Sequence, residues 1–249
     1  MFDLKGKKAL ITGASGGIGK EIARTLDSFG AEICISGRNS EELNSLNNTV
    51  NQECKIITCD LTKDKDITNL VKEAEEGLGQ IDILVNNAGV NFSEENKNFS
   101  INKYEKLMNV NLKAPFLITQ AVTKKMIKYK YGRIINISSI LSERVRVGKS
   151  AYSSSKFGLV GFTRTLSVEL AKYNILVNSI SPGLIETEMT KSMLTKQQIK
   201  KFRKEIPLKR LGKTEDVSSA VVYLSSDINQ FITGHNLVVD GGLLNHLNV

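Results

Sequence analysis

Tyrosine, lysine and serine stand at spacings that suit acid–base chemistry on an oxygen atom. Tyr152 and Lys156 are four residues apart in a segment of helical character, so their side chains share one face of that helix. A free phenol has a pKa of about 10, too high for efficient proton transfer near neutrality, and a neighbouring ammonium group lowers it. Ser139 follows a predicted strand, where its hydroxyl could hold a substrate oxygen beside the tyrosine. The three residues together predict an acid–base site.

A glycine-rich segment near the start of the chain is typical of a phosphate-binding turn. Residues 12–19 read Thr-Gly-Ala-Ser-Gly-Gly-Ile-Gly, between a short apolar run and a helical segment. Glycines at 13, 17 and 19 permit a tight turn and let backbone N–H groups and a helix N-terminus approach a pyrophosphate. Glycine turns also occur in loops that bind nothing, but a place between a first strand and a first helix is what dinucleotide binding requires. We therefore predict a dinucleotide site here.

The end of the second predicted strand bears on which dinucleotide is bound. An acidic residue there accepts hydrogen bonds from a ribose 2′-hydroxyl, whereas a basic residue pairs with a 2′-phosphate. This chain has Ser36, Gly37 and Arg38 at that point, and its next carboxylate is Glu41. Arg38 is placed for a charge-assisted bond to the phosphate with Ser15 as a second donor, although a loop arginine can also simply be solvated. The pattern favours NADP(H) over NAD(H).

These groups lie in a chain that alternates short apolar runs with longer segments of helical period. Strands are predicted at 9–12, 32–36, 55–59, 83–85, 133–137, 176–181 and 237–239. Helices are predicted at 19–29, 40–50, 64–78, 104–128, 152–172 and 216–225. This alternation implies parallel pairing through right-handed crossovers. We expect one α/β domain over residues 1–249, a doubly wound Rossmann fold whose seven-stranded parallel sheet carries helices on both faces. Residues 186–211 interrupt the alternation and are predicted to form a small substrate cap.

The composition excludes several other classes of protein. The length of 249 residues and a 41% hydrophobic fraction suit a core that needs no disulfide or metal. The three cysteines Cys34, Cys54 and Cys59 have no CxxC spacing and lie far from both histidines, so we expect reduced thiols and no metal site. We find no signal peptide and no apolar run that could span a bilayer, so a cytoplasmic protein without membrane contact is expected.

The net charge of +8 comes from lysines spread along the whole chain, a distribution that does not favour nucleic-acid binding. The loop at 142–149 contributes Arg144 and Arg146, and a denser group follows at 191–213, where Glu205 is the one acidic residue. That group consists of Lys191, Lys196, Lys200, Lys201, Arg203, Lys204, Lys209, Arg210 and Lys213. If both segments border the entrance, the substrate is anionic. The alternative is that these side chains are simply solvated.

The order and spacing of the motifs resemble the short-chain dehydrogenase/reductase family over essentially the full length. Besides the glycine turn, the resemblance rests on Asn86-Asn87-Ala88-Gly89, Asn111, Ser139, Tyr152 with Lys156, and Ser181-Pro182-Gly183. It implies an oxidoreductase that moves a hydride between a nicotinamide ring and a carbonyl or alcohol carbon. Relatives that only sense a dinucleotide commonly lack the tyrosine or the lysine, so catalysis is favoured over a non-catalytic sensor.

The resemblance also implies a role for each site residue. Tyr152 is the general acid in reduction and the base in oxidation, Lys156 binds the nicotinamide ribose, Ser139 orients the carbonyl, and Asn111 holds a water of a proton relay. The implied cofactor-binding residues are Gly13, Ser15, Gly17, Ile18, Gly19, Arg38, Asp60, Asn86, Ala88, Gly89, Tyr152, Lys156, Pro182, Gly183, Ile185 and Thr187. Among them Asp60 contacts the adenine ring, and the 86–89 segment lines the adenine ribose while also stabilising the sheet.

The C-terminal half is most similar to 3-oxoacyl-[acyl-carrier-protein] reductases, through residues 182–190, 206–212 and 231–242. Sugar, sugar-acid and nucleotide-sugar dehydrogenases share these stretches and form the alternative. The substrate is thus a small or carrier-linked carbonyl compound. The family resemblance also implies a homotetramer, for which Gly158 and Gly161 would let helices approach closely.

Overall fold

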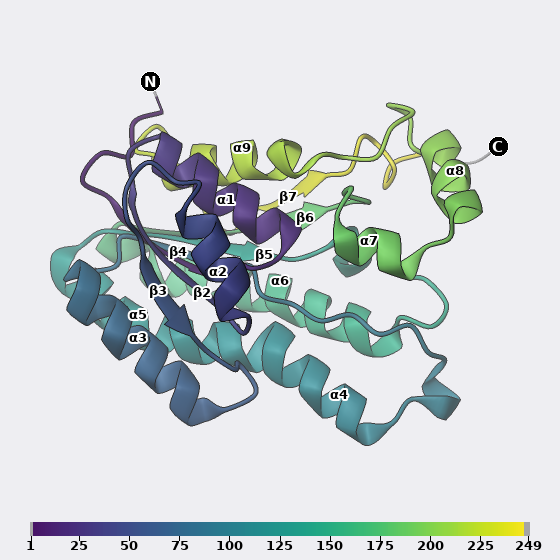
Figure 1. Ribbon diagram of the computed structural model, residues 1–249, viewed down its shortest axis with the longest axis horizontal. Helices are drawn as coiled ribbons and strands as arrows, with labels where there is room; N and C mark the ends of the chain where they lie inside the picture. Colours follow the sequence, from purple (N-terminus) through teal and green to yellow (C-terminus); the bar gives the residue numbers. More distant parts are fainter. Residues whose placement is uncertain (1, 247–249) are drawn as a thin grey trace.

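Seven strands form the centre of the computed structural model, which describes residues 2–246. The strands are β1 (Lys8–Thr12), β2 (Glu32–Gly37), β3 (Lys55–Thr58), β4 (Ile83–Asn86), β5 (Gly132–Ile137), β6 (Ile175–Pro182) and β7 (Asn236–Val239). All of them pair in parallel, in the order β3-β2-β1-β4-β5-β6-β7. The order reverses between β1 and β4, and this switch leaves a crevice outside the carboxyl ends of the strands. The predicted doubly wound sheet is confirmed (Figure 1).

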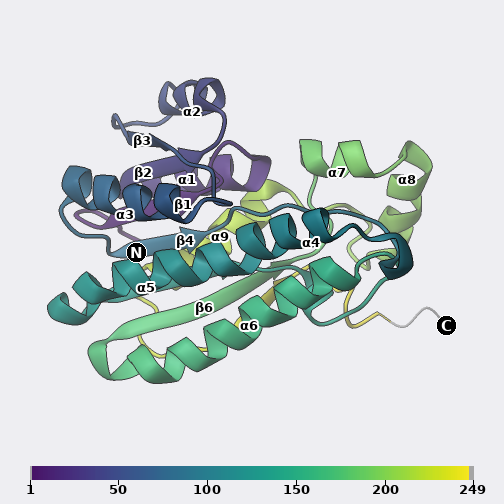
Figure 2. The same cartoon turned by 90° about the horizontal axis from the view of Figure 1, so that it is seen from below.

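Helices cover both faces of the sheet, because parallel strands joined by helices are buried on both sides (Figure 2). One face carries α1 (Gly17–Ser28), α2 (Ser40–Asn47) and α9 (Thr214–Ser225), and the other carries α3 (Asp64–Leu78), α5 (Ala114–Tyr129) and α6 (Ser150–Leu170). The alternation along β1 shows how the strands serve both layers. Ala9 and Ile11 pack in the core beneath α1 and α9, whereas Leu10 packs in the core beneath α3 and α5.

The prediction of one continuous helix at 104–128 is wrong, because an irregular turn divides this segment. The structure has α4 (Ile101–Met108) and α5 joined by a π-helical turn over Asn109–Lys113. Asn111 lies within this turn and is completely buried, with its side chain bonded to the backbone of Val90. A π turn inserts one residue into the helical repeat, which allows such an inward rotation. Periodicity averages over a helix, so it does not detect a single irregular turn.

The segment at 186–211 forms two short helices that stand over the carboxyl ends of the strands, α7 (Glu188–Met193) and α8 (Lys196–Glu205). Thr187 caps α7, and Thr195 with Gln198 forms a capping box on α8. A small apolar cluster seats the segment against the rest of the protein, made up of Ile140, Ile206, Leu211 and Leu243. Within residues 2–246, no helix combines the length and apolar character needed to cross a membrane.

Candidate active site

A cleft of about 1160 Å³ opens at the carboxyl ends of the strands, beneath the cap. Of the predicted site residues, those that line it are Gly13, Ser15, Gly17, Ile18, Gly19, Arg38, Asp60, Ala88, Gly89, Ser139, Tyr152, Lys156, Pro182, Gly183, Ile185 and Thr187. Asn86 and Asn111 lie behind its wall. The fold therefore brings together residues that are far apart in the sequence, in a cavity large enough for a dinucleotide and a small substrate.

The glycine turn is packed too closely for side chains at two of its positions. Gly13 has a φ of +67°, and a Cβ atom on it would lie 2.7 Å from the Cα atom of Ala88. A Cβ atom on Gly19 would lie 2.6 Å from Nδ2 of Asn87. The turn leads into α1, whose first backbone N–H groups receive no side-chain cap from Gly16. Such a bare cradle at the start of a helix fits the pyrophosphate of a dinucleotide.

Asn87 lines the cleft, whereas Asn86 does not. The side chain of Asn86 therefore does not line the adenine ribose, and that expectation is wrong. The Asn87 amide donates to Thr12 O at 2.9 Å and to Gly13 O at 3.1 Å, which ties the glycine turn to β4. Asn86 is the last residue of β4 and donates instead to Thr119 and Asn136 inside the protein. Successive residues along a strand point to opposite sides of the sheet, so Asn86 and Asn87 have different surroundings. Because β4 pairs with β1, the residue that follows β4 lies next to the glycine turn that follows β1, and this could have identified Asn87.

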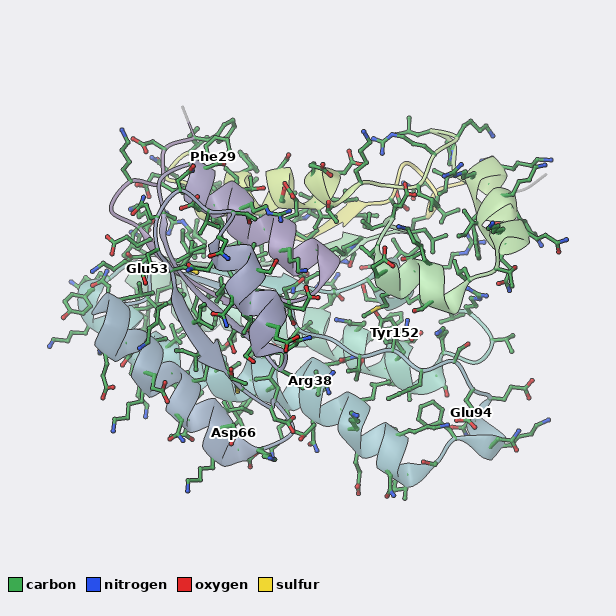
Figure 3. All side chains as sticks on the ribbon, viewed as in Figure 1. Phe29, Arg38, Glu53, Asp66, Glu94 and Tyr152 are labelled. Carbon is green, nitrogen blue, oxygen red and sulfur yellow. The ribbon has the colours of Figure 1, made fainter. Side chains whose placement is uncertain are left out.

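The end of β2 carries an exposed cationic side chain at one end of the cleft. Arg38 is exposed there, and Ser15 lies close by, since a Cβ atom on Gly37 would be 2.8 Å from its Oγ atom. The nearby carboxylate of Glu42 is paired with Lys20. The exposed guanidinium can pair with a negatively charged group. Figure 3 labels Arg38 and Tyr152, which both line the cleft.

Asp60 follows β3 and forms part of the same wall. Its Oδ1 atom accepts hydrogen bonds from the backbone N–H of Thr62 at 3.1 Å and from the Thr62 hydroxyl at 2.8 Å. The hydrogen bonds from Thr62, chiefly that of its backbone, and the charge of Arg38 hold the pKa of this carboxyl below its usual value. Asp60 is therefore a fixed, ionised acceptor.

Tyr152, Ser139 and Lys156 meet in the middle of the cleft. Tyr152 is half-buried in the first turn of α6, and burial raises its pKa, while a hydrogen bond from Ser139 acts in the opposite direction. The Lys156 ammonium lies 5.8 Å from the centre of the tyrosine ring and donates to Ile137 O at 2.8 Å. Burial lowers the pKa of Lys156 to about 8. The expectation that the pKa of the Tyr152 phenol is lowered is wrong for the protein without cofactor. Burial raises this pKa by more than the hydrogen bond from Ser139 lowers it.

Asn111 does not face the cleft but fixes one of its walls. Its Oδ1 atom accepts from Val90 N at 2.8 Å, and its Nδ2 group donates to Val90 O at 2.9 Å and to Ser155 Oγ at 3.2 Å. A Cβ atom on Gly89 would lie 3.6 Å from Asn111 Oδ1 and 3.7 Å from Lys156 Nζ. Asn111 therefore lies directly behind the lysine and joins the π turn to α6 and to the segment after β4.

The cations of the cap do not border the entrance, and this part of the prediction is wrong. Of the described residues that line the cleft, those from α8 are Gln198, Phe202 and Glu205, while the lysines of the cap point elsewhere. Two of the cap cations form ion pairs with carboxylates just outside the 191–213 segment. Lys191 pairs with Glu188 at 2.8 Å, and Arg210 pairs with Asp216 at 2.6 Å. The loop before α6 does line the cleft, with Arg144, Arg146 and Lys149.

These geometric features agree with comparisons to known proteins. A family model described as enoyl-(acyl carrier protein) reductase matches residues 13–244. The 3-oxoacyl-[acyl-carrier-protein] reductase FabG of Rickettsia felis is 42% identical over 244 residues, which cover 98% of this chain and 99% of the relative. This chain belongs to the short-chain dehydrogenase/reductase family. It is an NAD(P)-dependent oxidoreductase that acts on CH–OH or C=O groups.

Solved structures of other short-chain dehydrogenases/reductases have the same fold over the whole chain. A short-chain type dehydrogenase/reductase from Mycobacterium marinum has a TM-score of 0.91, with 33% identity and 97% of each chain covered. A gluconate 5-dehydrogenase from Burkholderia cenocepacia, solved with NADP and tartrate, has a TM-score of 0.92 and 32% identity, with 99% of this chain and 98% of that chain covered. The similar proteins thus include enzymes named for different substrates, a 3-oxoacyl-[acyl-carrier-protein] reductase at 42% identity and a gluconate 5-dehydrogenase at 32%.

Proposed function

We propose that the protein is an NADP(H)-dependent reductase that converts the 3-oxo group of a carrier-linked acyl chain to a 3-hydroxy group. One observation supports catalysis: Ser139, Tyr152 and Lys156 lie together in the cleft that the glycine turn also lines. The substrate class is supported by the relatives named 3-oxoacyl-[acyl-carrier-protein] reductase, which match almost the whole chain.

The side chains divide the work of the reduction between them. The bound nicotinamide supplies the hydride that becomes the new C–H bond at the carbonyl carbon. Tyr152 gives its phenolic proton to the carbonyl oxygen, and the Ser139 hydroxyl holds that oxygen by a hydrogen bond. The Lys156 ammonium binds the nicotinamide ribose and stabilises the phenolate left on Tyr152. We assign the water that returns a proton to the site to a position behind the lysine, next to Asn111, whose Oδ1 atom keeps one lone pair beyond the bond from Val90.

We assign the cofactor's adenosine and nicotinamide ends to opposite parts of the cleft. Arg38 and Ser15 receive the 2′-phosphate, which is the basis for NADP(H) over NAD(H). Asp60 accepts from the adenine, and Ala88 and Gly89 line its ribose. Pro182, Gly183, Ile185 and Thr187 lie around the nicotinamide carboxamide, and Thr187 also lies next to the glycine turn, since a Cβ atom on Gly17 would be 3.0 Å from its methyl group.

A sugar-acid or keto-sugar reductase is the second candidate. It is favoured by the gluconate 5-dehydrogenase of similar fold and by the cations of the 142–149 loop that line the cleft. A non-catalytic sensor has no comparable support, because every catalytic residue of the family is present. In either enzymatic case we place the protein in the cytoplasm, where its three free cysteines would remain reduced.

A comparison of substrates tests the proposal directly. NADPH consumption is measured with an acetoacetyl thioester and, in parallel, with a set of keto-sugars and oxo sugar acids. We expect the thioester to have the highest kcat/KM, with little turnover when NADH replaces NADPH. Turnover of the sugar acids alone would transfer the assignment to the second candidate.

A further inference from the structure

Lys149 is a buried lysine of the substrate end of the cleft that the reaction described above does not use. It directly precedes α6, the residue is only 4% exposed, and it lines the cleft. Its ammonium donates to Asn91 Oδ1 at 2.8 Å and to Phe92 O at 3.2 Å. It lies 6.0 Å from the centre of the Tyr152 ring, so it is close to the position of the reacting oxygen.

The charge of Lys149 has no counter-charge in the described part of the protein. Both of its acceptors are neutral, and within residues 2–246 no carboxylate lies within ion-pair distance of its ammonium. An ammonium has three donors, so two acceptors leave one N–H unused. Burial, and then the charge of Arg146, lower the pKa of Lys149 to about 8, which leaves the group mostly protonated at neutral pH. A buried cation of this kind disfavours the fold unless a partner supplies the opposite charge.

Arg146 adds a second cation to the same wall. Its guanidinium lies 5.4 Å above the ring of Phe202 on α8, which also lines the cleft, so it projects across the entrance towards the cap. Two cations that repel each other in one wall are a common arrangement for binding an anion, because the ligand relieves the repulsion. The glycine cradle at the start of α1 already serves the pyrophosphate of the cofactor, so the anion at Lys149 is a different one.

We propose that Lys149, assisted by Arg146, binds an anionic oxygen group of the substrate and thereby determines substrate specificity. This inference rests on the proposed function in its second form, the reduction of an oxo acid at Tyr152. The group is the carboxylate of that oxo acid, because the phosphate of a phosphopantetheine arm lies at the far end of the arm from the reacting carbonyl and cannot reach an ammonium 6.0 Å from the centre of the Tyr152 ring. Its negative charge accepts from the unused N–H of Lys149 and completes the shell of that ammonium.

The test measures binding, so that it does not depend on turnover. Calorimetry on the enzyme saturated with NADP+, which cannot reduce a ketone, gives the dissociation constants of a matched pair of probes. Acetoacetate is compared with its neutral ethyl ester. The pair therefore reports the contribution of a carboxylate to binding.

We expect the wild-type protein to prefer the anionic member of the pair by about tenfold or more, as a charge-assisted hydrogen bond allows. Lys149→Met should reduce this ratio to near one and leave the neutral member bound as before, which a general loss of structure would not do. Lys200→Met, a matched change on the cap outside the cleft, should retain the wild-type ratio. Equal binding of both members in wild type, or an unchanged ratio in Lys149→Met, overturns the proposal.

The pH dependence provides a second measurement that needs no loss of the side chain. The preference for the anion should decline above pH 8 in the wild-type protein and persist in Lys149→Arg, because a guanidinium stays charged. The other charged or titratable groups around Lys149 are Arg146, the Tyr152 phenol and Glu94, whose carboxylate is engaged by Lys103 at 2.7 Å. Lys156 titrates in the same range, and an equal decline in Lys149→Arg would assign the effect to Lys156 and overturn this inference. Failure of the thioester as a substrate with NADPH would instead overturn the proposed function alone.

Discussion

At the scale of single residues, the environment of Tyr152 sets the direction in which it transfers a proton most readily. Burial raises the pKa of the phenol and the Ser139 hydrogen bond offsets only part of that effect. The phenol therefore holds its proton at neutral pH, which suits its role as the acid in reduction. Oxidation needs the phenolate, so its rate should increase with pH where reduction does not.

Lys156 makes cofactor binding sensitive to pH. Its pKa is lowered to about 8, so it carries a charge below that pH and loses it as the pH rises. Because the ammonium binds the nicotinamide ribose in our proposal, the affinity for NADPH should fall by up to about tenfold per pH unit above 8. Fluorescence titration of NADPH between neutral and alkaline pH measures this. Lys156→Met should bind weakly at every pH, and a wild-type affinity that does not vary with pH would contradict the assignment.

Arg38 should determine the preference between the two dinucleotides. Arg38→Ala removes the exposed guanidinium at the end of β2 and should raise the KM for NADPH by about ten- to a hundredfold, the value of a charge-assisted contact. The KM for NADH is the internal control and should remain unchanged, since NADH has no 2′-phosphate. A parallel loss with both cofactors would mean that Arg38 supports the loop rather than the phosphate.

At the scale of elements, the buried side chain of Asn111 ties the π turn at Asn109–Lys113 to Val90 and to α6. Replacing Asn111 with alanine leaves the N–H and C=O of Val90 without partners and should lower the free energy of unfolding by about 2–4 kcal/mol. Denaturant unfolding followed by circular dichroism measures the change. Asn102→Ala, on the exposed face of α4, is the matched control and should change stability by less than about 0.5 kcal/mol. Equal stabilities of the two variants would show that Asn111 does not hold the turn.

The strands and helices were predictable from the sequence, whereas the orientation of single side chains within them was not. Apolar runs such as β1 and the flanking glycines identified the strands, the helices and the crevice, because burial on both faces leaves a continuous hydrophobic signal. The inward rotation of Asn111 and the exchange of roles between Asn86 and Asn87 depend on single-residue register, which periodicity does not contain. The sequence also did not predict that the cap lysines lie outside the cleft, because a count of charges does not indicate which face of α8 lines it.

At the scale of the whole molecule, α5 and α6 leave apolar side chains exposed. Phe116 is 47% exposed and Val168 is 80% exposed, and the rings of Phe116 and Phe162 lie 5.5 Å apart. Of the two glycines expected to allow close approach, Gly158 packs against Leu112 of its own chain, whereas Gly161 faces open space. Such a surface is a candidate for contact between subunits.

We expect sedimentation of the wild-type protein to give the mass of four chains. Phe116→Glu should produce smaller species, because it places a charge in the proposed interface. Phe29→Glu, at the end of α1 and away from that surface in Figure 3, should leave the mass unchanged. A monomeric wild-type protein would overturn the expected assembly without affecting the assignment of the site.

The path of the hydride tests the central claim most directly. The protein is incubated with an acetoacetyl thioester and NADPH that carries deuterium at the reactive position of the nicotinamide, and the product is examined by mass spectrometry and NMR. We predict that deuterium appears on the carbinol carbon, and that Tyr152→Phe still binds NADPH but loses at least about a hundredfold in kcat. Absence of a reduced product from this and from every other carbonyl compound tried, or an unimpaired Tyr152→Phe, would contradict an oxidoreductase that uses this tyrosine.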